Sequence, residues 1–194
     1  KSFNNVCRPK SSNIHRLYPY WVLLLASSFL FYKYILQLFP SIITEQLMQQ
    51  FHLSGVGLGN LTAAFFYAFL VTQLFAGPLL DKFTPAKLSA LAISLMAAGG
   101  WLFAKSHQFC FAFVARMLIG AGGAFATVSY LKMAAIWFSP KQYAVISGLL
   151  ATAAMLGSMV GQAPMVFLVG KLGWRTCLVY TAFAGSILSC VYWF

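Results

Sequence analysis

Six long apolar runs constrain this chain more than any other feature of its sequence. Apolar residues make up 61% of its 194 residues and charged residues only 8%, against roughly 25% charged residues in water-soluble domains. A helix needs about 20 apolar residues to cross the hydrocarbon core of a bilayer. The sequence therefore predicts an all-α membrane protein with six transmembrane helices. The predicted spans are residues 20–39, 55–80, 85–104, 109–138, 142–170 and 176–194.

The distribution of positive charge predicts how these spans are oriented. The N-terminal tail, residues 1–19, and the second and fourth connections carry seven lysines and arginines, whereas the other connections carry three. Lysine and arginine are enriched on the cytoplasmic side of membrane proteins, so we expect a cytoplasmic tail. The short connections between the spans are typical of proteins of the bacterial inner membrane. The tryptophans fit the same orientation, with Trp21, Trp137 and Trp193 at the inner boundary and Trp101 and Trp174 at the outer boundary.

Composition also excludes several function classes. The net charge of +11 comes from 13 cations that stand singly between apolar runs, which argues against a nucleic-acid partner. With two acids, three histidines outside the spans and no nucleophile or metal motif, we expect no enzyme, no cofactor and no metal site. The four cysteines form no C-x-x-C pair, so we expect free thiols.

One polar connection carries a motif. Residues 77–87 read Gly-Pro-Leu-Leu-Asp-Lys-Phe-Thr-Pro-Ala-Lys, a G-x-L-x-D-[KR]-x-x-P-x-K pattern. The fourth run contains Arg116-x-x-x-Gly120-x-Gly122-Gly123-Ala124 and ends in Trp137-Phe-Ser-Pro, and the fifth ends in Gly173-Trp-Arg. In this order and spacing, residues 20–194 resemble the N-terminal six-helix domain of the major facilitator superfamily.

Two positions depart from the family pattern. Thr84 and Pro85 replace the usual glycine and arginine of the loop, which puts its full charge network in doubt. The antiporter signature G-x-x-x-G-P reads Gly157-x-x-x-Gly161-Gln162 here. The missing proline argues against a drug-exporting antiporter.

The resemblance implies a 3+3 inverted repeat that forms half of a twelve-helix, rocker-switch transporter. The other half would be a C-terminal domain or a second chain. The first helix, which ends in Phe39-Pro40, resembles those of nutrient and organic-anion importers. We therefore expect secondary active transport of a small polar solute, anionic or zwitterionic, such as an organic acid, a sugar phosphate or an amino acid. The alternatives are a multidrug/proton exporter of the same superfamily and a non-transporting six-helix scaffold or regulatory subunit.

Lys33 and Arg116 are the main candidates for solute binding. A charge inside a span is costly and needs a partner or a wet cavity. Both residues lie about 10 Å from the outer ends of their helices at 1.5 Å per residue. In the family, the first and fourth helices line the central path, so we expect an electropositive spot there. The alternatives are a structural role for Arg116, and for Lys33 a snorkelling side chain or an acid partner in the other half.

Four further residues are weaker candidates for the solute site. Gln37 follows Lys33 by one turn and shares its face. Tyr34, Tyr67 and Gln162 are polar groups within spans, with packing or core hydrogen bonding as the alternative for each.

Asp81 is a gate residue by resemblance, together with Gly77, Lys82 and Lys87 of the same loop. The alternative for Asp81 is a simple helix-end acid. Lys132, near the inner end of the fourth run, is expected to reach the cytoplasmic surface or to approach Asp81. Because the spans contain no acid or histidine, proton coupling would need groups of the other half, or the carrier is an exchanger or uniporter.

Overall fold

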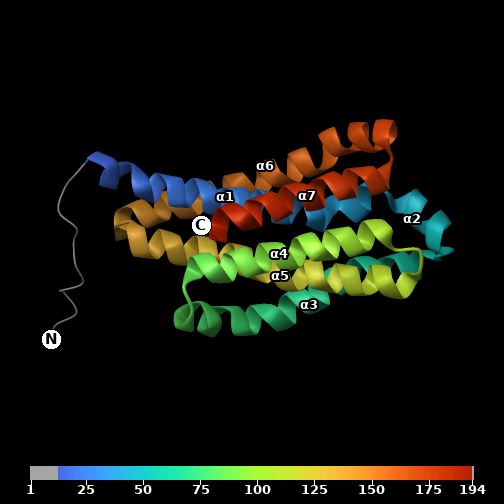
Figure 1. Ribbon diagram of the computed structural model, residues 1–194, viewed down its shortest axis with the longest axis horizontal. Coiled ribbons are helices and arrows are strands. Elements are labelled where there is room, and N and C mark those ends of the chain that lie inside the picture. The colour runs from blue at the N-terminus through green and yellow to red at the C-terminus, as the bar shows by residue number, and fades with distance from the viewer. Residues whose placement is uncertain (1–12, 194) are drawn as a thin grey trace.

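The computed structural model describes the backbone of residues 13–193, and the side chains of those residues except 13–20, 137, 140 and 141. Within this range the chain forms seven α-helices and no strand (Figure 1). The helices are α1 (Asn13–Ile42), α2 (Thr44–Phe51), α3 (Gly55–Lys82), α4 (Pro85–Lys105), α5 (Phe109–Trp137), α6 (Pro140–Leu172) and α7 (Trp174–Trp193).

Six of these helices are long and apolar enough to cross a membrane, which confirms the predicted all-α, six-span fold class. Two details differ from the sequence prediction. Helix α1 begins at Asn13, inside the segment expected to be a tail, while residues 1–12 of that tail lie outside the described residues. Helix α2 occupies a connection predicted as a loop; it is polar and eight residues long, with only Leu47 buried, so a search for apolar runs misses it.

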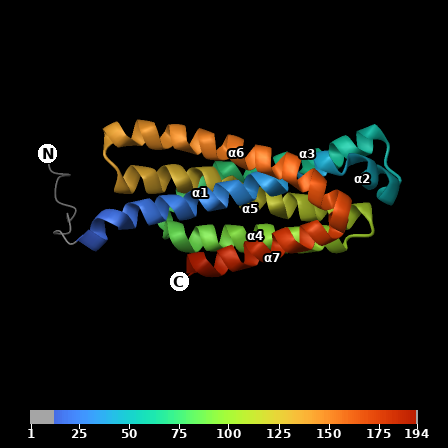
Figure 2. The same cartoon turned by 90° about the horizontal axis from the view of Figure 1, so that it is seen from above.

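The helices are arranged around α5, which packs against α4, α3 and α1. The six long helices form two groups of three, α1–α3–α4 and α5–α6–α7. The second helix of each group packs on the first helix of the other group: α3 packs on α5, and α6 packs on α1. The third helix of each group, α4 and α7, also pack on each other (Figures 1 and 2). This reciprocal pairing is the arrangement expected of two inverted three-helix repeats.

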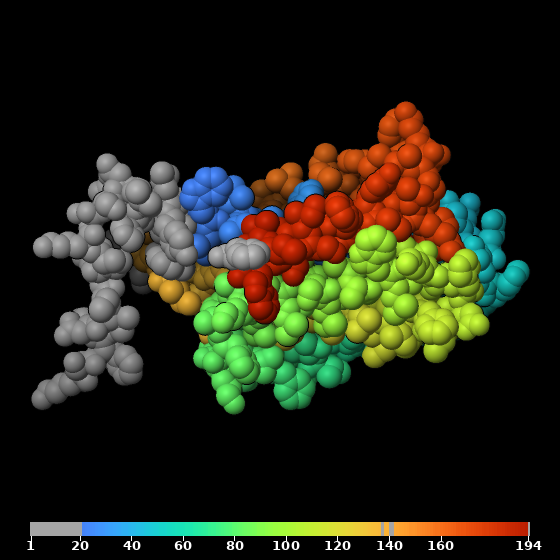
Figure 3. All heavy atoms as spheres, viewed as in Figure 1, coloured from blue at the N-terminus to red at the C-terminus, as the bar shows by residue number. Residues whose placement is uncertain are grey.

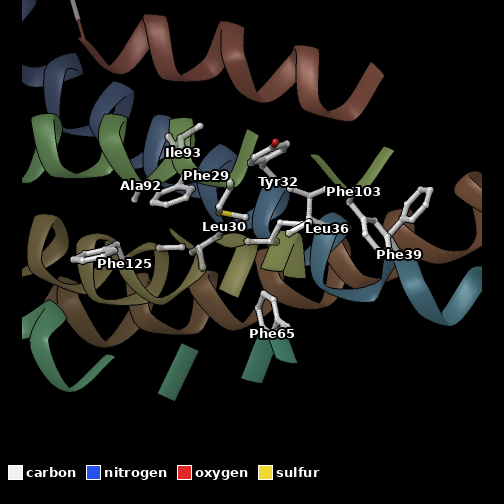
Figure 4. Close-up of a cluster of buried hydrophobic side chains, with 14 of the residues drawn as sticks. Phe29, Leu30, Tyr32, Leu36, Phe39, Phe65, Ala92, Ile93, Phe103 and Phe125 are labelled. Atoms are coloured by element: carbon white, nitrogen blue, oxygen red, sulfur yellow. The ribbon is translucent and has the colours of Figure 1, made fainter. Parts of the chain in front are cut away.

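The core lies where α1, α4 and α5 meet. Figure 4 shows Phe29 and Leu30 of α1 between Ile93 of α4 and Phe125 of α5, and all four side chains are buried. Lipid tails are as apolar as these side chains, so close packing rather than exclusion of water stabilises the contact.

Glycines allow the backbones of α5 and its neighbours to touch. A Cβ atom on Gly120 would collide with the carbonyl oxygen of Phe65 in α3, and one on Gly122 with the carbonyl oxygen of Ala92 in α4. The family-like R-x-x-x-G-x-G-G sequence therefore has a packing function: it lets α5 lie between α3 and α4 at backbone contact.

We predict that Gly120→Ala destabilises the protein by about 1–3 kcal/mol or more, because the new methyl group meets backbone that cannot swing away. Gly148→Ala on α6 is the matched control, since a Cβ there has no neighbour within 4 Å. Thermal unfolding in detergent measures both. Equal melting temperatures for the two variants would contradict the close contact of α5 with α3.

Candidate functional site

Lys33 is a buried cation that has no anionic partner among the described residues. It projects from α1 and is only 4% exposed. Its ammonium nitrogen lies 4.1 Å from the centroid of the Tyr34 ring and 5.1 Å from that of Phe69 in α3. No hydrogen bond or ion pair joins it to another described residue. Aromatic faces attract a cation, but they leave the three N–H donors of the ammonium group without an acceptor.

Gly123 of α5 has no side chain, and this leaves space for the side chain of Lys33. A Cβ at position 123 would lie 3.3 Å from Cγ of Lys33 and 3.5 Å from the Phe65 ring. The aliphatic part of the Lys33 side chain therefore lies against Gly123, where α1, α3 and α5 meet. This glycine belongs to the motif that carried the family resemblance.

Arg116 is the second cation at this junction, and its two terminal nitrogens bond to the backbone of α1. It is 1% exposed. Its Nη1 donates to the carbonyl oxygen of Leu36 at 3.0 Å, and its Nη2 to that of Gln37 at 3.4 Å. The guanidinium carbon lies 5.2 Å from the centroid of the Phe65 ring. Its Nε is buried without a hydrogen-bond partner among the described residues.

Pro40 explains why α1 offers a carbonyl to Arg116. In an α-helix the carbonyl of residue i accepts from the N–H of residue i+4. The partner of the Leu36 carbonyl would be residue 40, and proline has no N–H. Arg116 supplies the missing donor from the neighbouring helix. The proline in the last turn of α1 and an arginine in α5 thus act together: one removes a backbone donor and the other replaces it.

The two cations share a pair of aromatic rings. Phe65 and Phe69, one turn apart on α3, are stacked with centroids 5.8 Å apart and an interplanar angle of 20°. Arg116 lies against Phe65, and Lys33 against Phe69. Figure 4 shows Phe65 of α3 facing the α1 segment that contains Leu36. The structure therefore brings Lys33 and Arg116 to one place, which we call the α1–α3–α5 junction.

The structure places two of the four weaker candidates near Lys33 and the other two on the exposed surface. Tyr34 covers Lys33 with its ring, and Gln37 is half-buried with an Oε1 that has no hydrogen-bond partner among the described residues. Tyr67 on α3 and Gln162 on α6 are exposed. Tyr67 instead lines a hollow of about 490 Å³ between α3 and α5. Of these four candidates, only Tyr34 and Gln37 lie with Lys33 and Arg116 at the junction.

The polar loop forms a second cluster at one end of the bundle. Lys132 of α5 makes an ion pair with Asp81 at 2.9 Å and also donates to the carbonyl oxygen of Leu80. Of the two outcomes expected for Lys132, the structure shows the approach to Asp81. Lys132 holds the last turn of α3, where helix carbonyls lack intrahelical donors. The Asp81 side chain is 79% exposed. Lys82 and Lys87 of the same loop are also exposed, and a Cβ on Gly77 would have no neighbour within 4 Å.

Comparison with known proteins identifies the family. The family model described as Major Facilitator Superfamily matches residues 22–194, nearly the whole chain. The chain belongs to the major facilitator superfamily.

Individual relatives of this superfamily are distant. The chain is similar to the uncharacterized transporter YybO of Bacillus subtilis, with 24% identity over 87% of this chain and 39% of the relative. It is also similar to the probable galactarate/D-glucarate transporter GudP of the same organism, with 24% identity over 78% of this chain and 35% of the relative. The chain thus spans well under half the length of these curated relatives.

A solved structure of the superfamily shares the fold. A bacterial homolog of the human lysosomal transporter Spinster, crystallised in an inward-facing and unoccupied conformation, superposes with a TM-score of 0.82 at 15% identity. The match covers 94% of this chain and 43% of that chain. At this identity the likeness concerns the arrangement of the helices alone.

Sequence reasoning missed the aromatic and backbone parts of the junction. Phe65 and Phe69 are four residues apart on one helix face, a spacing that indicates a paired ring surface. Pro40 indicates a free carbonyl one turn earlier in α1. Both signals are present in the sequence, but neither says which side chain of which helix lies opposite.

We predict a non-additive effect between Pro40 and Arg116. Arg116→Met leaves the buried Leu36 carbonyl without a donor, a loss of about 1–3 kcal/mol. In a Pro40→Ala background, the new N–H at position 40 bonds that carbonyl, so the same arginine substitution costs about 1 kcal/mol less. Unfolding of the two single variants and the double variant in detergent measures the coupling. Strictly additive effects would contradict the assignment of Arg116 to the carbonyl freed by Pro40.

Proposed function

We propose that this chain forms one six-helix half of a secondary active transporter that works by rocker-switch alternating access. Its membership of the superfamily and its six spans support this function. The second half is a further six-helix unit, either a C-terminal domain or a second chain. The match to only 43% of the solved relative supports the need for such a unit. The central path then lies between the two halves, near the bilayer midplane.

The observation that carries the solute class is the unpartnered ammonium group of Lys33. A buried charge needs a counter-charge or hydrogen-bond acceptors, and no described residue supplies either to Lys33. A carboxylate supplies both, because it is an anion with two acceptor oxygens. We therefore propose that Lys33 holds an anionic group of a small polar solute, with Tyr34 and Gln37 beside it.

Arg116 plays a different part in this proposal. Its two terminal nitrogens already donate to α1, so it fixes the α1 segment that follows Lys33 by one turn. Arg116 therefore positions the binding lysine and adds positive potential to the site without taking the carboxylate itself.

The solutes for which two relatives are named support a solute that carries a carboxylate. GudP is named for galactarate and D-glucarate, and a lysosomal dipeptide transporter of Danio rerio is 25% identical to this chain. All of these solutes carry carboxylates. A multidrug resistance protein of Bacillus subtilis is also 25% identical, but Gln162 replaces the proline of the antiporter signature. We therefore favour carriers of organic acids or other carboxylates over drug exporters.

The membrane setting of the transporter follows from the charge distribution. We propose a multi-pass protein of a bacterial inner membrane, with the N-terminus and the Asp81 loop in the cytoplasm. The chain's two acids are Glu45 on α2 and Asp81 at the end of α3. Neither lies at the junction, so proton coupling would use titratable groups of the second half.

Lys33→Gln tests the solute site. In the complete transporter we expect it to weaken binding of galactarate, or of another carboxylate found by screening, by about 10- to 100-fold, the value of a charge-assisted hydrogen bond. Lys33→Arg should retain part of the affinity. Isothermal titration calorimetry measures binding, and a melting temperature no lower than that of the parent protein shows that the variant is folded.

Lys171→Gln is the matched control, because Lys171 also lies over an aromatic ring, 4.4 Å from the centroid of Phe167, but is exposed. Its affinity should equal that of the parent protein. Unchanged affinity in Lys33→Gln would refute the assignment of the anion to Lys33. If the complete parent protein binds no solute in a broad carboxylate, sugar and amino-acid screen, the non-transporting scaffold is the better account.

The exposed Asp81 is proposed as a cytoplasmic gate residue, with Gly77, Lys82 and Lys87 in the same loop. We predict that Asp81→Asn leaves solute affinity unchanged but lowers the transport rate in proteoliposomes by at least about tenfold. Its effect on stability should stay below about 1 kcal/mol, because exposed ion pairs contribute little. A normal transport rate in this variant would reduce Asp81 to a helix-end acid that pairs with Lys132.

A further inference from the structure

Two hollows open side by side where α4 begins and α7 ends. The larger, of about 470 Å³, lies between α1, α4 and α7 and is lined by Trp21, Leu25, Ala86 and Tyr192 among others. The smaller, of about 330 Å³, lies beside α3 and is lined by Leu79, Phe83, Leu88 and Leu91. Figures 1 and 2 show the start of α4 next to the end of α7 in both views, and Figure 3 shows the two segments adjoining on the surface. Both volumes lie within the range of small-molecule sites.

Three residues line both hollows: Thr84, Lys87 and Trp193. Lys87 is therefore the one cation among the described residues that line the two hollows. Lys87 is exposed and makes no ion pair with any described residue. Apart from this shared group, the smaller hollow is lined by apolar side chains only. The combination is one positive charge between two apolar depressions.

The start of α4 adds unpaired backbone donors at the same point. Thr84 is the N-cap residue of α4, but its side chain makes no capping hydrogen bond. Pro85 follows and has no N–H, so the N–H groups of Ala86 and Lys87 are the free donors of the first turn. The helix dipole gives this end a partial positive charge that attracts anions, phosphate in particular.

We propose that this end of the bundle binds one anionic glycerophospholipid of the surrounding bilayer. Its phosphate lies at Lys87 and the start of α4, and one acyl chain fills each hollow. A lipid fits better than a soluble phosphate compound, because one anionic head with two apolar tails matches one cation with two apolar hollows. Trp21 and Trp193 at the rim are 63% and 64% exposed, and tryptophan favours the level of the lipid headgroups. This site is independent of the proposed solute and of Lys33.

Native mass spectrometry of the detergent-purified protein tests the site. Phosphatidylglycerol and phosphatidylcholine with identical acyl chains are titrated separately. We expect one phosphatidylglycerol to bind in preference to phosphatidylcholine, and Lys87→Gln to lower its affinity by about fivefold, the value of one lysine near an anionic headgroup.

Lys105→Gln is the matched control, because Lys105 lies at the other end of α4 and also beside a tryptophan, 5.9 Å from the Trp101 ring. It should bind phosphatidylglycerol like the parent protein. Three results would overturn the proposal: equal affinity for the two lipids, an equal loss in Lys105→Gln and Lys87→Gln, or displacement of the lipid by glycerol 3-phosphate. The last result would assign the site to a soluble phosphate compound.

Discussion

The contact between Arg116 and the backbone of α1 is the interaction on which the rest of the site depends. Pro40 leaves the Leu36 carbonyl without its helical donor, and the guanidinium group supplies one at 3.0 Å. The glycines that follow Arg116 let α5 approach α3 and α4 at backbone distance. The arginine and the glycines of one motif therefore set both the position of α5 and the position of the α1 segment next to Lys33.

Lys33 and Arg116 are neighbouring buried cations with different partners among the described residues. Both lie against the stacked pair of Phe65 and Phe69. Arg116 presents a planar fork that matches two carbonyl oxygens on one helix, so much of its hydrogen-bonding capacity is used within the protein. Lys33 has a compact ammonium group, with only aromatic faces nearby among the described residues. The difference in their partners, rather than in their charge, is the reason why we propose a structural role for Arg116 and a solute-binding role for Lys33.

The sequence was sufficient to predict the six spans and the placement of Lys33 and Arg116 on neighbouring helices, and it offered the approach of Lys132 to Asp81 as one of two outcomes. These predictions depend on apolar length, helix rise and motif order, which are local properties. The pairing of Arg116 with the Leu36 carbonyl is not local, because it requires knowledge of which face of α5 meets α1. Helix α2 was missed because only Leu47 of its eight residues is buried. The separation of Tyr67 and Gln162 from the junction likewise depends on helix rotation, which polarity alone does not specify.

The central claim is that Lys33 binds the carboxylate of the solute, and a distance measurement tests it most directly. Solid-state NMR of the complete transporter can combine lysine labelled with ¹⁵N at Nζ and a bound solute labelled with ¹³C in its carboxylate. A charge-assisted hydrogen bond would place the two nuclei within about 4 Å, and the dipolar coupling should vanish in Lys33→Gln at saturating solute. A coupling that persists in that variant, or no coupling in the parent protein with solute bound, would contradict the account.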